Sequence, residues 1–113
     1  MTRDEVVIAM QSEDIRSLRA VLRWYKRYIC PLYLSNPVHL ILFELVHWQC
    51  EERVMLSEWL STQQLRLTLH SARTLNTALA IYVSAVQARP RRSGLRASVV
   101  ATVSRLHEQL RDI

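Results

Sequence analysis

The stretch Ile15–Ile29, IRSLRAVLRWYKRYI, carries two stripes of residues that face in opposite directions on a helix. Its apolar residues recur at steps of three and four, which is the spacing of one helix face. They are Ile15, Leu18, Leu22, Tyr25 and Ile29. The basic residues fall on the other side, and they are Arg16, Arg19, Arg23, Lys26 and Arg27. The pattern predicts an amphipathic helix over residues 13–30, with one face on a core and one face open to negative groups.

The residues that flank this stretch indicate where helices begin and end. Ser12 is a typical N-cap residue, and Glu13 is favourable at the positive end of the helix dipole. Pro31 disfavours helical geometry in the residue before it, so we expect the helix to end there. Asn36 followed by Pro37 combines a capping residue with a proline at the first helical position, which predicts the start of another helix.

The rest of the chain is also predicted to be helical. Thr2 with Glu5, and Ser61 with Gln64, match the capping-box pattern that opens helices. Residues 65–70 alternate between apolar and polar as a strand does, but the helical spacing that follows them favours a helix. The predicted helices cover residues 3–10, 13–30, 37–60, 62–88 and 94–112, with one kinked helix over 37–88 as the alternative to the third and fourth.

Composition supports an all-α fold in a single domain, residues 1–113. Half of the 113 residues are hydrophobic, which is enough for a core. One glycine and three prolines are too few for the many turns of an all-β fold. We expect a compact bundle of four main helices plus a short N-terminal helix, with no internal repeat. A coiled-coil-like seam in the last helix consists of Leu95, Val99, Val103, Leu106, Leu110 and Ile113.

The two cysteines, Cys30 and Cys50, are expected to be free thiols. In an antiparallel hairpin that turns near Leu34 they would lie about 20 Å apart, whereas a disulfide allows roughly 7 Å between Cα atoms. Free thiols indicate a reducing compartment, so we expect an intracellular protein of the cytoplasm or nucleus. The N-terminus lacks a signal-peptide pattern, and the most apolar run, Val38–Trp48, is too short to span a membrane.

Charge is distributed unevenly along the chain. The net charge is +5; residues 15–34 hold five cations and no acid, whereas residues 37–61 hold four acids and one arginine. A row of cations beside Trp24 and Tyr28 could follow a phosphate backbone, which makes nucleic acid the alternative partner. The cations of this hypothesis are Arg16, Arg19, Arg23, Lys26, Arg27, Arg91 and Arg92. An anionic membrane surface, or a solvated face partly neutralised by the acids of residues 37–61, explains the same pattern.

Glu44, His47, Cys50 and Glu51 bring metal-binding and nucleophilic residue types together at helical spacing. A helical di-metal site would need further carboxylates from other helices, and the later predicted helices carry acids only at the end of the chain. Nothing in the sequence orients His47 as a base toward Cys50, and a single glycine excludes a glycine-rich phosphate loop. We therefore expect no metal, no cofactor and no enzyme activity.

Apolar residues exceed what one small bundle buries easily. Residues 40–48 and 78–86 are apolar on most sides of their predicted helices, and a helix that is apolar all round needs neighbours on all sides. The expected function is therefore that of a small interaction protein, such as an adaptor, chaperone or regulator. It would self-associate, for example as a homodimer, or bind another protein. The predicted interface residues are Leu40, Phe43, Trp48, Trp59, Leu79 and Tyr82.

Overall fold

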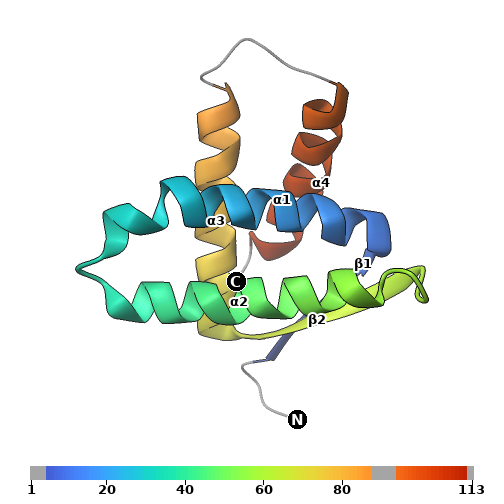
Figure 1. Ribbon diagram of the computed structural model, residues 1–113, viewed down its shortest axis with the longest axis horizontal. Coiled ribbons are helices and arrows are strands. Elements are labelled where there is room, and N and C mark those ends of the chain that lie inside the picture. The colour runs from blue at the N-terminus through green and yellow to red at the C-terminus, as the bar shows by residue number, and fades with distance from the viewer. Residues whose placement is uncertain (1–4, 88–93, 112–113) are drawn as a thin grey trace.

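Four α-helices and a two-stranded antiparallel sheet make up the described part of the chain (Figure 1). The computed structural model describes residues 5–87 and 94–111, without the side chains of residues 94–96 and 98. In chain order the elements are β1 (Glu5–Gln11), α1 (Ser12–Tyr28), the 3-10 helix η1 (Cys30–Tyr33), α2 (Pro37–Leu56), β2 (Thr62–Thr68), α3 (Leu69–Gln87) and α4 (Gly94–Leu110). The fold is therefore mostly helical, and the all-α prediction is correct only in that coarser sense.

The prediction of a helix over residues 3–10 is wrong, because the strand β1 lies there. β1 and β2 pair antiparallel, from Glu5 opposite Thr68 to Gln11 opposite Thr62. Alternate residues of β1 point into the core, so that Ile8 is buried while its neighbours in the chain are less so. This period of two is the strand pattern, and it outweighs the capping-box match at Glu5.

The strand β2 likewise replaces the first turns of the helix predicted over residues 62–88. Leu65 and Leu67 are buried and alternate with exposed polar residues, whereas helical geometry begins only at Leu69. The strand separates α2 from α3, so a single kinked helix over 37–88 is also excluded. The strand-like alternation in residues 65–70 was the correct signal for most of this segment.

The boundaries of α1 and α2 follow the predicted signals with small shifts. α1 covers 12–28 in place of 13–30, and the Ser12 hydroxyl donates a hydrogen bond to the Leu60 carbonyl, so it does not cap the helix. Asn36 does cap α2, because its side chain accepts a hydrogen bond from the His39 N–H at 3.2 Å. α2 ends at Leu56 in place of residue 60.

The two halves of the described chain repeat the order strand, helix, helix, which the sequence analysis did not predict. β2, α3 and α4 each begin 57 residues after β1, α1 and α2. Ile8 and Leu65 are also 57 residues apart, and they lie directly opposite each other in the sheet. An approximate two-fold axis therefore passes between these two residues and relates the two strand–helix–helix units. Figure 1 shows the corresponding helical hairpins, α1–α2 and α3–α4.

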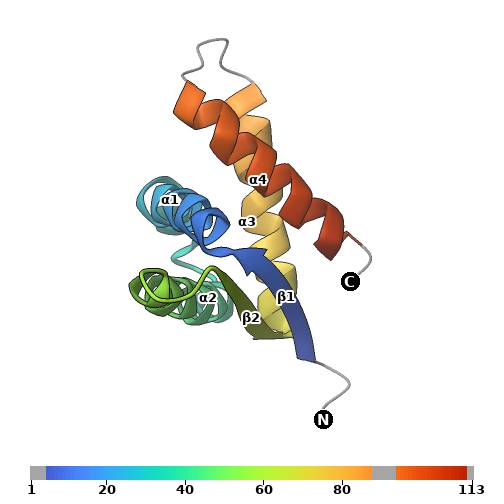
Figure 2. The ribbon, with the colours of Figure 1, turned by 90° about the vertical axis from the view of Figure 1, so that its right-hand side faces the viewer.

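The core lies where the two hairpins cross. α1 packs against α2 and α4, and α3 also packs against both of them. Figure 2 shows the pair α1 and α2 nearly end-on beside α3 and α4, with the strand pair next to them. The apolar stripe predicted for α1 is buried, since Ile15, Leu18 and Leu22 have no exposed surface. Burial of each such side chain contributes about 1.5–3 kcal/mol.

The last helix and the cysteines agree with the predictions where they are described. The buried side chains of the α4 seam are Val99, Val103, Leu106 and Leu110. The remaining two seam positions, 95 and 113, lie outside the described side chains. Cys30 and Cys50 are both free thiols and both buried.

Candidate functional site

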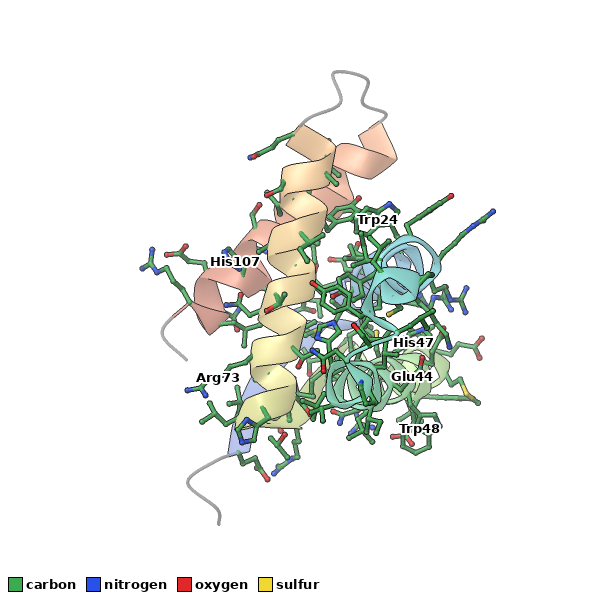
Figure 3. All side chains as sticks on the ribbon, turned by 90° about the vertical axis from the view of Figure 1, so that its left-hand side faces the viewer. Trp24, Glu44, His47, Trp48, Arg73 and His107 are labelled. Carbon is green, nitrogen blue, oxygen red and sulfur yellow. The ribbon has the colours of Figure 1, made fainter. Side chains whose placement is uncertain are left out.

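A row of exposed apolar side chains runs along the outer face of α2. Its members are spaced three, four or seven residues apart, so they share one side of the helix. Between Trp48 and Met55 the next position of this spacing is Glu52, which is polar. Each member is between 56 % and 73 % exposed. In Figure 3, Trp48 projects from α2 on the side away from α3. We call this row the α2 stripe, and it consists of Val38, Ile41, Leu45, Trp48 and Met55.

The α2 stripe includes a shallow depression of about 440 Å³. Its lining residues are Leu40, Ile41, Glu44, Leu45 and Trp48. Only Glu44 among them is charged, so the depression is suited to an apolar side chain of a partner. Trp59, in the turn that follows α2, adds a further large apolar side chain, which is 74 % exposed.

The structure separates the six predicted interface residues into two groups. Trp48 and Trp59 are exposed and Leu40 is half-buried. The other three lie in the core and are not available to a partner: Phe43, Leu79 and Tyr82. The stripe residues Ile41 and Leu45 were not among the predicted interface residues. Their spacing of three and four residues to Trp48 indicates that they lie on the same helix face as Trp48.

The basic face of α1 lies against the acidic residues of α2. Arg23 Nε donates to Glu51 Oε1 at 2.8 Å, and Lys26 Nζ lies 3.1 Å from Glu44 Oε1. Arg16 donates to the Ser57 hydroxyl at 3.0 Å. Much of the predicted nucleic-acid stripe is thus engaged within the chain, as expected for a face that α2 partly neutralises.

The remaining cations of that stripe are placed differently. Arg27 lies over the Tyr28 ring, 5.3 Å from its centroid, and Arg19 is half-buried. Arg91 and Arg92 lie outside the described residues. The structure therefore places five of the seven predicted cations, all of them on α1.

The pKa of the Glu51 carboxyl group reflects the charges at the α1–α2 contact. Burial acts to raise the pKa of Glu51, but the hydrogen bond and charge of Arg23 outweigh it, with help from His47 and Arg19. The pKa of Glu51 consequently lies below its ordinary value. Glu51 is held as an anion that pairs with Arg23, which fixes the two helices relative to each other.

The group Glu44, His47, Cys50 and Glu51 does not converge on one point. His47 Nε2 lies 3.4 Å from Glu51 Oε1, while the Cys50 thiol points into the core toward the Ile15 carbonyl at 3.7 Å. Burial raises the pKa of Cys50 to about 12, so the thiol stays protonated, and a protonated thiol is a poor nucleophile and metal ligand. Within the described chain there is no cluster of three or more histidine, cysteine or acidic residues placed to hold a metal ion.

Comparisons with protein-family models, with curated proteins and with solved structures return no match for this chain. Among the residues that the structure describes, no helix is both long enough and apolar enough to cross a membrane.

Proposed function

We propose that this protein is a small non-enzymatic interaction protein that associates with a second copy of itself through the α2 stripe. The observation that carries the proposal is the continuous exposure of Ile41, Leu45 and Trp48 on one face of α2. A soluble protein gains no stability from large apolar side chains in water, whereas it gains association energy when they are covered.

The size of the α2 stripe supports this proposal. Its five side chains, each more than half exposed, offer on the order of 600 Å² of apolar surface, and a standard interface buries about 800 Å² per partner. Leu40 and Glu44, which line the depression beside the stripe, add to the area available to a partner. Trp48 lies one helical turn from Leu45, the middle member of the row, and tryptophan is among the residues that contribute most to binding at the centre of an interface.

The spacing of the α2 stripe favours a second copy as the partner. Residues at alternating steps of three and four interlock with the same pattern on another helix, and a two-fold contact uses one surface patch on both partners. The acids beside the stripe do not oppose this pairing, because Glu44, Glu51 and Glu52 each have a cation partner within the chain: Lys26, Arg23 and Arg53.

The experiment that tests the proposal is the solution mass by light scattering at micromolar concentrations, in low and high salt. We expect twice the 13.2 kDa chain mass, insensitive to salt. Leu45→Arg, an exposed substitution that leaves the core intact, should weaken association about thirtyfold, as the loss of a ~2 kcal/mol hot spot does. Leu32→Arg, at an exposed apolar residue outside the stripe, is the matched control and should leave the dimer intact.

A monomer at the highest soluble concentration would contradict the proposal, as would a dimer that survives both Leu45→Arg and Trp48→Glu. We do not propose nucleic-acid binding by the basic face of α1, where the acids Glu44 and Glu51 of α2 lie beside Lys26 and Arg23 and lower the positive charge of that face.

A further inference from the structure

The strand pair β1–β2 presents a second solvent-facing surface that the proposed function does not use. One face of the pair is packed on the core, and every second residue points outward and is exposed. On β2 the outward residues are Thr62, Gln64, Arg66 and Thr68, all with hydrogen-bonding side chains. We call this surface the ribbon face.

The helix α2 holds the backbone of β2 in place along one edge of the strand pair. The Gln49 side chain donates to the Arg66 carbonyl at 2.8 Å, and the Arg66 N–H donates to Gln49 Oε1 at 2.7 Å. Arg53 Nε donates to the Gln64 carbonyl at 3.0 Å. Gln64 and Arg66, the two outward residues of β2 with the longest side chains, are therefore the two whose backbone is fixed from outside the sheet. Such preorganisation lowers the entropy lost on binding.

The Arg66 side chain is directed across the ribbon face. Its Nη1 lies 3.1 Å from Glu5 Oε1 on β1, and the side chains of both residues are partly exposed, at 60 % and 38 %. An exposed ion pair of this kind contributes little to stability, so Arg66 can exchange Glu5 for another acceptor at low cost.

From these observations we propose that the ribbon face binds the major groove of double-stranded DNA, with Gln64 and Arg66 contacting base edges. The major groove of B-form DNA, about 12 Å wide, admits a two-stranded ribbon. Arginine pairs in bidentate fashion with guanine and glutamine with adenine. Alternate residues of a strand are about 6.8 Å apart, which spans two base-pair steps of about 3.4 Å.

The electrostatics of the chain agree with this partner. The net charge is +5, which favours approach to a phosphate backbone. Among the described residues, Glu5 is the one acid on the ribbon face, and it lies at the end of β1, opposite Thr68. Arg73, in the first turns of α3, projects outward into solvent (Figure 3) and adds positive charge to the element that follows β2.

The approximate two-fold axis allows a prediction about the symmetry of the recognised DNA sequence. The positions equivalent to Gln64 and Arg66, 57 residues earlier, are Val7 and Ala9. These two residues cannot form hydrogen bonds to bases through their side chains. The recognised sequence should therefore be non-palindromic, with base contacts concentrated on the side that β2 reads.

The test begins with a randomised library of DNA duplexes, from which the purified full chain selects binders, followed by fluorescence anisotropy on an enriched duplex. We expect enrichment of a short asymmetric motif. Arg66→Met and Gln64→Ala should each weaken binding about tenfold, the loss of one bidentate base contact. The control variants Arg19→Ala and Arg27→Ala, on α1, should leave the affinity nearly unchanged, and circular dichroism establishes that every variant is folded.

Three outcomes would overturn the inference. The first is a folded wild-type chain that retains no duplex at near-physiological salt. The second is equal binding of a double-stranded RNA, whose deep and narrow major groove excludes a ribbon. The third is binding that the Arg66 and Gln64 variants leave intact while the Arg19 and Arg27 variants abolish it. Leu45 lies outside the ribbon face, so the Leu45→Arg variant should still bind DNA. DNA binding by this variant therefore tests the present inference independently of the self-association proposal.

Discussion

At the scale of single residues, His39 shows how a polar side chain is accommodated between two helices. Its Nε2 lies 2.7 Å from the Tyr25 hydroxyl, and its ring stacks on Tyr33 with 4.2 Å between ring centroids. Burial lowers the pKa of His39 below 6.5 and raises the pKa of Tyr25, with further contributions from Tyr33 and Cys30. The hydrogen bond therefore joins two neutral groups, the Tyr25 hydroxyl and the His39 imidazole. The contact links α1 to the start of α2 across the turn that contains η1.

The lowered pKa of His39 predicts a pH dependence of stability. The unfolded chain binds the proton more readily than the folded one, so the free energy of unfolding should fall as pH drops below the unfolded value of about 6.5. Above that pH both states carry a neutral imidazole and no dependence arises from His39. Urea denaturation between pH 7.5 and pH 5.5, above the range where carboxylates titrate, measures the effect. His39→Gln should flatten the curve; parallel curves for variant and wild type would refute the assignment.

At the scale of secondary-structure elements, the contact between α2 and β2 is what makes the strand pair part of the fold. A two-stranded hairpin is marginal alone in water, and here its inner face is buried while Gln49 and Arg53 cover one edge. Gln63 adds a third connection, because its Nε2 donates to the Arg53 carbonyl at 2.9 Å and to Ser12 Oγ at 3.2 Å. The strand β2 is thus connected by hydrogen bonds to both α1 and α2.

Removing the Gln49 side chain should loosen β2. Gln49→Ala deletes two hydrogen bonds to the Arg66 backbone, each contributing about 0.5–1.5 kcal/mol, so we expect the free energy of unfolding to fall by about 1–3 kcal/mol. Hydrogen exchange at the Arg66 amide, followed by NMR, should accelerate at the same time. Gln109→Ala, at an exposed position of α4, is the matched control and should change neither quantity. Unchanged protection of the Arg66 amide in Gln49→Ala would argue against the contact.

At the scale of the whole molecule, the two strand–helix–helix units are interlocked. α1 packs on α4 as well as on α2, and Asp14 of α1 accepts hydrogen bonds from Thr102 at 3.2 Å and Arg105 at 2.8 Å on α4. Trp24 of the first unit contacts Tyr82 of the second edge-on, with 5.3 Å between ring centroids. Neither unit buries its apolar surface without the other.

Interlocking predicts that the chain unfolds in one cooperative step. All three tryptophans, Trp24, Trp48 and Trp59, belong to the first half, so tryptophan fluorescence follows that half while circular dichroism follows all helices. Leu106→Ala, a buried truncation in α4, should lower the free energy of unfolding by about 2–5 kcal/mol. Both signals should shift to the same new midpoint. If the fluorescence transition keeps its wild-type midpoint, the two halves unfold independently. Ser104→Ala, at an exposed position of α4, is the control and should leave both midpoints unchanged.

The sequence by itself determined the elements whose signals are local. The stripe over residues 15–29 fixed the buried face of α1, Asn36 and Pro37 fixed the start of α2, and the spacing from Val99 to Leu110 fixed the buried face of α4. These features follow from the helical period and from caps, which involve residues a few positions apart.

Only the tertiary structure decided the strands and the exposed surfaces. β1 and β2 depend for their hydrogen bonds on partners 51 to 63 residues away, so the local capping patterns at Glu5 and Gln64 led to a wrong prediction. The chain is apolar around most of α2, and its sequence alone does not say which side Phe43 or Leu45 faces. α1, α3 and β2 cover the Phe43 side and leave the Leu45 side in water, because a face is buried only where another element packs on it.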